Sequence, residues 1–214
     1  MRSDDPEVYH HSRSVVGAVL LMSNPLPMEA LSCLLGVSGI PTTLRSLHSL
    51  LLVPSNGTDP IRVFHKSFSD FLTDPRRCKD ARIFINPSVH HREILLSCLN
   101  LMKVRLERNI CDLDEHASLE KVEGLPARRK ALIGDALEYA CRFWARHLLR
   151  TPSSGCDAEE ARRAIDEFFT TRLLCWIEVL VVMGSLDVGL YAMSCIREWY
   201  ISVSCELFVR RSLC

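Results

Sequence analysis

The feature that most restricts the fold is a short segment rich in turn-forming residues, which separates two β-favouring stretches. This segment covers residues 54–60 and contains two prolines, an Asn-Gly pair and an aspartate. The flanking residues 50–53 and 61–65 are rich in Leu, Val and Ile, and Asn-Gly is a preferred pair at a hairpin tip. The pattern predicts a β-hairpin with Asn56 and Gly57 at its tip.

Helical patterns surround this hairpin. Residues 10–22 form an apolar run that ends at a proline, and residues 28–35 end at Gly36, which suits a left-handed cap. A third helix is predicted to begin at Thr42 or Thr43, and a fourth covers residues 67–72. Three short helices followed by a hairpin are the elements of a winged-helix domain, in that order.

The second part of the chain shows only amphipathic helical patterns. Residues 95–106 carry one apolar stripe, and residues 137–148 repeat the template with Glu138 and Arg142 paired on the polar side. Breaks at residues 112–124 and 151–155 separate these helices from further apolar patterns at 158–182 and 186–199. The predicted fold class is therefore mainly α. We expect a winged-helix-like α+β module with a β-hairpin over residues 1–80, an all-helical, superhelical domain over 81–199, and a tail over 200–214.

Charge and hydropathy exclude two classes of partner. The chain has 26 Lys and Arg against 26 Asp and Glu, so it lacks the basic surplus of a general nucleic-acid binder. Its longest apolar runs, residues 15–22 and 179–183, are far shorter than the ~20 residues of a membrane helix. We expect neither a nucleic-acid partner nor a membrane.

The ten cysteines are expected to be reduced. The first residues are charged and do not resemble a signal peptide, and several cysteines lie inside apolar helical patterns, where a thiol acts as a small hydrophobic group. We therefore expect a cytoplasmic protein.

A search for catalytic and metal-binding motifs finds none. The one Gly-x-x-x-x-Gly pair, Gly184 and Gly189, is followed by leucine instead of the Lys-Ser/Thr of a phosphate-binding loop. Cys-x-x-Cys, His-Glu-x-x-His and Gly-x-Ser-x-Gly are missing from the sequence. The pairs His10-His11 and His90-His91 are predicted to be exposed or capping, because adjacent residues point to different sides. We expect no catalytic residue, no metal site and no cofactor for this chain alone, and we assign Trp144, Trp176 and Trp199 to the core.

His65 is the residue with the best claim to a function. It lies where the hairpin ends and the helix over 67–72 begins, a junction from which a side chain can reach a neighbouring domain. An imidazole N–H there could donate to a phosphate oxygen. The alternative is a histidine that only caps the junction.

Several segments together resemble the region that follows the nucleotide-binding domain in fungal NACHT proteins, which are STAND ATPases similar in plan to NOD-like receptors. The resemblance extends from about residue 10 to about residue 199, and His65-Lys66-Ser67-Phe68 matches the His-x-Ser-Phe motif of the family's winged helix. The segments that carry it are residues 13–22, 44–54, 61–75, 139–148 and 173–184. Residues 200–214 match nothing in the family, as expected of a frameshifted, unspliced or truncated end.

This resemblance implies an oligomerisation switch in which ADP holds the receptor closed and ATP lets the winged helix swing away. It implies that His65 contacts the β-phosphate of ADP when a NACHT domain is present, in cis or from a relative, and that WD-type or other repeats can follow. The family's phosphate-binding loop and magnesium-binding segment lie outside this sequence, so the resemblance implies a non-catalytic regulatory segment.

Two other functions stay open. The helical domain could be a stand-alone adaptor that binds a protein partner. The winged helix could bind DNA, although its third helix offers only Arg45 to phosphates or bases.

Overall fold

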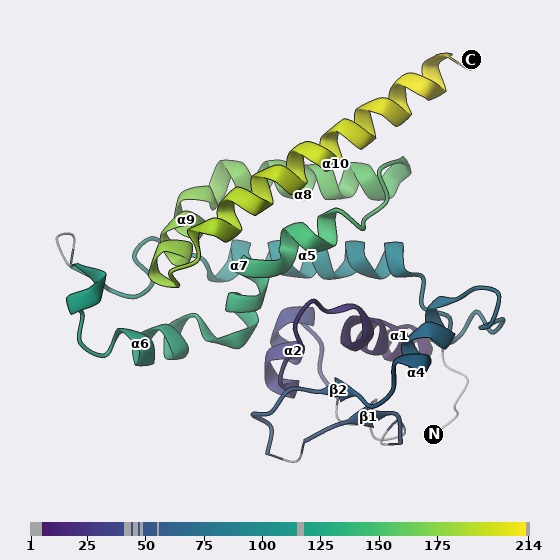
Figure 1. The fold of residues 1–214 in the computed structure, drawn as a ribbon, viewed down its shortest axis with the longest axis horizontal. Helices are drawn as coiled ribbons and strands as arrows, with labels where there is room; N and C mark the ends of the chain where they lie inside the picture. The colour runs from purple at the N-terminus through teal and green to yellow at the C-terminus, as the bar shows by residue number, and fades with distance from the viewer. Residues whose placement is uncertain are drawn as a thin grey trace.

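The structure is a computed structural model that describes residues 6–40, 44, 47, 49–54, 56–114 and 118–212, with side chains described between residues 11 and 204. It confirms the predicted fold class: the chain is mainly helical with a small antiparallel hairpin (Figure 1). The elements are α1 (Pro6–Leu21), α2 (Met28–Leu35), β1 (Leu51–Leu52), β2 (Arg62–Val63), α4 (Lys66–Thr73), α5 (Pro87–Arg105), η1 (Leu119–Lys121), α6 (Leu125–Leu132), α7 (Gly134–Leu148), α8 (Gly155–Thr171), α9 (Leu173–Val182) and α10 (Leu186–Ser212).

The turn and cap residues near the start of the chain act as predicted. Gly36 ends α2 with φ 64°, and its N–H donates to the carbonyl of Ser32. The hairpin pairs Leu51 with Val63 and Leu52 with Arg62, so the turn segment lies at its tip. Most of the predicted third helix, including Thr42, Thr43 and Arg45, lies outside the described residues.

α5 is longer than its apolar stripe because two residues before the stripe favour a helix start. The side chain of Asn86 accepts a hydrogen bond from the Ser88 N–H, and Pro87 occupies the first helical position. The stripe residues Leu95, Cys98 and Met102 are fully buried, as their spacing predicts.

The last helices differ in extent from their sequence patterns. The apolar pattern over 158–182 is divided into α8 and α9 at Arg172, whose backbone leaves the helical region. The Arg172 Nε–H there donates to the Lys103 carbonyl on α5, 2.9 Å away. α10 continues past Trp199, and Tyr200 donates from its hydroxyl to Asp166 on α8 at 3.0 Å. The start of the predicted tail is thus part of a helix that touches α8.

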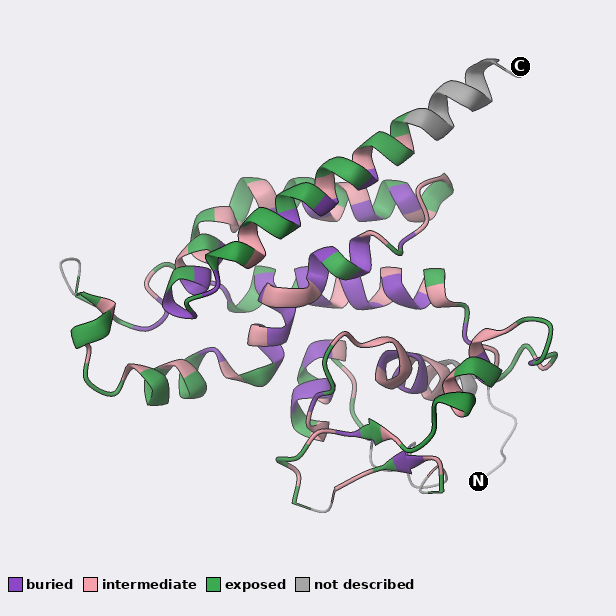
Figure 2. Cartoon of the chain, in the orientation of Figure 1, coloured by how far each residue is buried: buried purple, intermediate pink, exposed green. Residues whose placement is uncertain are grey.

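The buried hydrophobic side chains form one cluster that extends through both parts of the chain (Figure 2). α1 and α2 pack against α5 and α7, which link the hairpin-bearing part to the helical array. Gly17 on α1 makes the closest approach, since a Cβ there would lie 2.1 Å from the His90 ring of α5. The division at about residue 80 stays a prediction, and the core crosses it.

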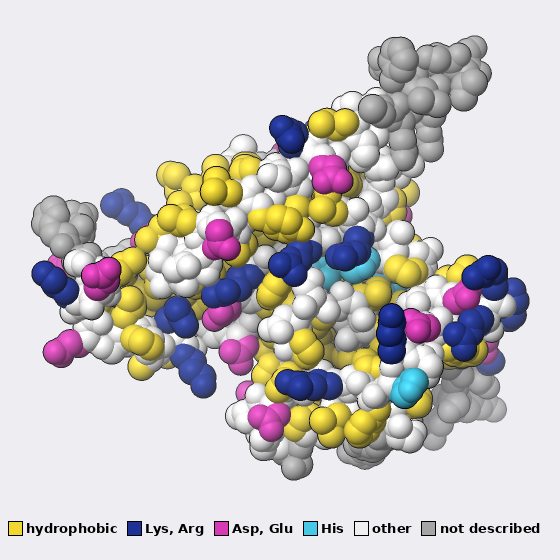
Figure 3. All heavy atoms as spheres, in the orientation of Figure 1, with side chains coloured by type: hydrophobic (Ala, Val, Ile, Leu, Met, Phe, Trp, Pro, Cys, Tyr) yellow, Lys and Arg dark blue, Asp and Glu magenta, His cyan; other side chains and the backbone are white. Residues whose placement is uncertain are grey.

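The array leaves a row of apolar side chains uncovered on α9 and α10. Leu174 is 80% exposed and Leu190 is 74% exposed, with Ile177, Leu186 and Met193 nearby in sequence and also exposed. Yellow side chains follow these helices along the upper edge of Figure 3. No described helix combines the length and the apolar character needed to cross a membrane.

Candidate functional site

His65 lies at the N-terminus of α4, directly after the second hairpin strand. It is the N-cap residue with extended backbone, and it is exposed. Its ring nitrogen Nδ1 lies 3.1 Å from the Ser67 N–H nitrogen and 2.7 Å from the Ser67 hydroxyl. The junction predicted from sequence is therefore present, and the capping role is filled by one nitrogen of the ring.

This cap fixes the tautomer of the His65 ring. Nδ1 must accept in order to satisfy the Ser67 N–H, so a neutral ring carries its proton on Nε2. Nε2 has no partner among the residues whose side chains the structure describes. His65 thus offers one outward N–H donor to a neighbouring domain while it caps α4.

The Gly-x-x-x-x-Gly pair has a packing role in this fold. Gly184 adopts φ 62° at the turn after α9, and a Cβ at Gly189 on α10 would lie 3.3 Å from Leu180 of α9. The pair lets α9 and α10 approach each other closely.

Metal ligands are not gathered in the part of the chain that the structure describes. No group of three or more His, Cys, Asp or Glu side chains there is arranged to hold a metal ion. Its eight cysteines are free thiols, and burial raises the pKa of Cys98 and Cys141, so both stay protonated.

The prediction for His90-His91 is wrong, because both side chains are buried. Adjacent residues do point to different sides of α5, as the sequence pattern predicts. Both of these sides are covered at this turn, so neither histidine is exposed. His90 lies over Gly17, and its Nδ1–H donates to the Asn86 carbonyl at 2.9 Å. His91 turns toward α7, where it meets His147, which is fully buried.

His91 and His147 belong to a chain of hydrogen bonds that joins three segments. The Ser23 N–H donates to the Tyr139 hydroxyl at 3.1 Å, and that hydroxyl lies 2.8 Å from His147 Nε2. The two Nδ1 atoms of His147 and His91 are 2.8 Å apart. We refer to these four residues as the histidine chain.

One arrangement of protons satisfies every member of the histidine chain. The Tyr139 hydroxyl accepts from Ser23, so its own proton is free to go to His147 Nε2. His147 then donates from Nδ1 to the Nδ1 of His91, and His91 keeps its proton on Nε2. All groups are neutral in this arrangement.

The surroundings keep both imidazoles neutral. Burial is the main cause and the positive charge of Arg150 a further cause that together lower the pKa of His91 to about 4. Burial lowers the pKa of His147 to about 3, with His91 and Arg150 as additional causes. Protonation of His91 would put a second donor at the Nδ1 contact, and protonation of His147 would put its new N–H against the Tyr139 hydroxyl proton, so either event disturbs the assigned arrangement.

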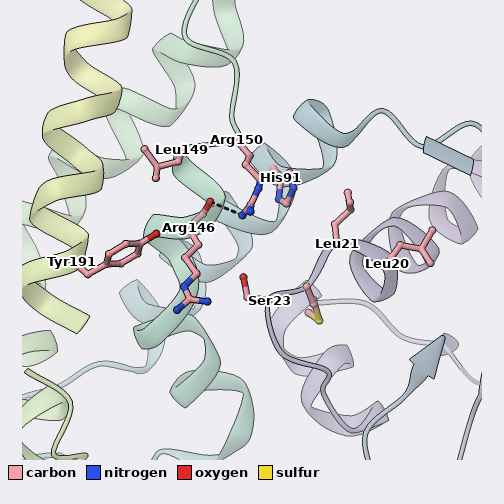
Figure 4. A pocket seen from close by; sticks show the side chains of 9 residues that line it. Leu20, Leu21, Ser23, His91, Arg146, Leu149, Arg150 and Tyr191 are labelled. Atoms are coloured by element: carbon pink, nitrogen blue, oxygen red, sulfur yellow. Dashed lines mark hydrogen bonds between the residues drawn. The ribbon is translucent and has the colours of Figure 1, made fainter. Parts of the chain in front are cut away.

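A pocket of about 590 Å³ opens beside His91, between the end of α1, the start of α5, the end of α7 and α10 (Figure 4). Among the described residues that line it, Arg146 and Arg150 carry charge, and Ser23 and Tyr191 add hydroxyl groups. Sequence reasoning missed this site. His147 and Tyr139 share one α7 face at eight-residue spacing, but their partners come from segments far away in sequence.

No family model, no curated protein and no solved structure matches this chain.

Proposed function

We propose that the chain is a non-catalytic regulatory segment of a NACHT-type, STAND-class signalling NTPase in the cytoplasm. It would close over the ADP-bound nucleotide domain and control oligomerisation in innate-immunity or self/non-self signalling. The observation that carries this proposal is His65. It stands exposed at the hairpin end of α4, in the His-x-Ser-Phe motif, with its Nε2–H free to donate to a phosphate oxygen.

The mechanism is differential binding. The Nε2–H of His65 can bond to a β-phosphate only when the winged helix lies against the nucleotide domain, so the contact favours the closed state. One such hydrogen bond stabilises by about 1.5–3 kcal/mol, which is far less than a micromolar nucleotide site needs. The chain alone is therefore expected to bind ATP and ADP weakly and to hydrolyse neither.

The test uses two substitutions of His65 in a receptor whose reading frame encodes a phosphate-binding loop before Met1. His65→Ala removes the cap and the donor, whereas His65→Asn keeps a cap acceptor and removes the imidazole N–H. Loss of one charge-assisted hydrogen bond should shift the equilibrium toward assembly about tenfold or more in both variants, without activating ligand. Light scattering after size exclusion measures the assembled fraction.

The Asn variant separates the two roles of the ring. A His65→Asn receptor that stays monomeric like wild type, beside an assembling His65→Ala receptor, would mean that the ring only caps α4. Sequencing the transcript in both directions from the Met1 codon shows whether the upstream loop is encoded.

A second function is supported by the uncovered apolar row on α9 and α10. Leu174 and Leu190 are too exposed to belong to the core, and such faces are typical of protein interfaces. If the chain is a helical adaptor, lysine at both positions should abolish binding to its partner and leave the fold intact.

The matched control for the adaptor test is Leu52→Lys on the hairpin, where the leucine is 46% exposed. Crosslinking followed by mass spectrometry measures partner binding, and circular dichroism measures the fold. Equal crosslinking by wild type and by the α9/α10 variant would remove this alternative.

A further inference from the structure

The pocket beside His91 has the size and lining of a small-molecule site. Its volume of about 590 Å³ lies within the usual range for such sites, and four elements of the chain surround it. Apolar surface comes from Leu20, Leu21, Met22 and Leu149, and aromatic surface comes from Tyr191. The remaining lining residues are Ser23, His91, Arg146 and Arg150, so polar and apolar groups line the same pocket.

The two arginines give the pocket an uncompensated positive charge. No Asp or Glu lines it, and neither guanidinium has a carboxylate partner within the described residues. The Arg146 guanidinium lies over the rings of Phe143 and Tyr191, at 5.2 and 5.7 Å from their centroids. Arg146 is thus oriented by uncharged neighbours and keeps its charge for a ligand.

Arg150 is held by backbone contact only. Its NH1 donates to the Arg146 carbonyl over 3.4 Å, the contact drawn as a dashed line in Figure 4. That long bond uses one of the five N–H groups of a guanidinium. Other carbonyls at this end of α7 accept hydrogen bonds from backbone N–H groups and from the Thr151 hydroxyl. Helix capping therefore leaves most N–H groups of the Arg150 guanidinium available.

His91, a largely buried residue, adds an independent donor to the same pocket. Its ring is 5% exposed, and its Nδ1 is occupied by His147. Nε2 carries the proton in the arrangement that satisfies the histidine chain, and this nitrogen has no partner among the side chains that the structure places. The pocket therefore combines two cations, one imidazole N–H and an apolar wall.

We propose that this pocket binds a small organic anion, a phosphate or carboxylate group on an apolar or aromatic body. The head group would lie between Arg146 and Arg150 and accept from His91 Nε2–H, because Arg binds both oxyanions with paired N–H groups. The body would lie against Leu149 and the end of α1. This site is separate from His65 and does not depend on the NACHT-type function.

The probes are 2-naphthyl phosphate, 2-naphthoate, 2-naphthol and inorganic phosphate, titrated calorimetrically into the whole chain at pH 7. We expect 2-naphthyl phosphate or 2-naphthoate to bind at least about tenfold more tightly than 2-naphthol and inorganic phosphate, since only they supply both head and body. Whichever of these two anions binds more tightly identifies the preferred head group, phosphate or carboxylate. Equal binding of the naphthol would overturn the proposal, as would no binding of either anion at millimolar concentration.

Substitutions of the two arginines test whether the anion binds in this pocket. Arg146→Gln and Arg150→Gln should each weaken the better anion about tenfold, whereas Arg197→Gln, an exposed arginine elsewhere on α10, should leave its affinity unchanged. Circular dichroism verifies that the variants fold. Unchanged affinity in both pocket variants would place the ligand elsewhere and contradict the proposal.

Discussion

Acidification from pH 7 to pH 5 is expected to lower the free energy of unfolding by about 4 kcal/mol through the two buried imidazoles of the histidine chain. In the folded protein the pKa of His91 is about 4 and that of His147 is about 3, both below the ordinary value of 6.5. The two imidazoles therefore bind more protons in the unfolded chain than in the folded chain between about pH 3 and pH 6.5. The contribution of the two neutral imidazoles to the free energy of unfolding is fully present above pH 6.5. It falls as the pH drops, by about 2 kcal/mol per imidazole at pH 5.

Urea denaturation followed by tryptophan fluorescence at pH 7 and pH 5 measures this effect. His91→Asn should lose about half of the pH dependence, because one titrating group is removed. His65→Asn is the matched control, because His65 lies outside the histidine chain and the variant leaves His91 and His147 in place. Equal unfolding free energies of the wild type at the two pH values would contradict the buried, neutral histidine chain.

Trp144→Ala should destabilise the protein by about 4 kcal/mol. The indole of Trp144 is fully buried and lies between Phe168 of α8 and Trp176 of α9, with ring centroids 5.4 and 5.8 Å away. Alanine would leave a cavity where three helices meet, and large-to-small changes of this kind cost about 3–5 kcal/mol.

Trp144→Phe is the control that separates packing from hydrogen bonding. The Trp144 Nε1–H is buried without a hydrogen-bond partner among the described atoms, so phenylalanine removes an unsatisfied donor and keeps most of the packing. We expect it to cost clearly less than alanine does. Trp176 differs, because its Nε1–H donates to the Cys141 carbonyl at 3.0 Å. A similar loss of unfolding free energy for Trp144→Phe and Trp144→Ala in urea denaturation would contradict a stabilisation that comes from ring packing.

The parts of the fold that could be predicted from sequence depend on local chemistry. Gly36 and the Asn56-Gly57 turn act within a few residues of their own position, so their effects could be anticipated. Apolar periodicity placed the core face of α5 for the same reason. His65 is a local case too, since its capping partner is Ser67.

The rest depends on contacts between distant segments. Nothing near His91 in sequence indicates that His147 will supply its partner, or that Gly17 will let α1 approach the ring of His90. The division of the pattern over 158–182 at Arg172 likewise depends on a carbonyl of α5. The pocket with Arg146 and Arg150 exists only because α1, α5, α7 and α10 meet there.

The most direct test of the proposed function is the binding of this chain, in trans, to the nucleotide-binding domain of a fungal NACHT protein. Calorimetry would compare the domain loaded with ADP and the domain loaded with a non-hydrolysable ATP analogue. The proposed function predicts that the ADP-loaded domain binds this chain at least about tenfold more tightly, and that His65→Asn removes this preference. Equal affinity of the wild-type chain for both loaded forms, or a preference that survives His65→Asn, would contradict it.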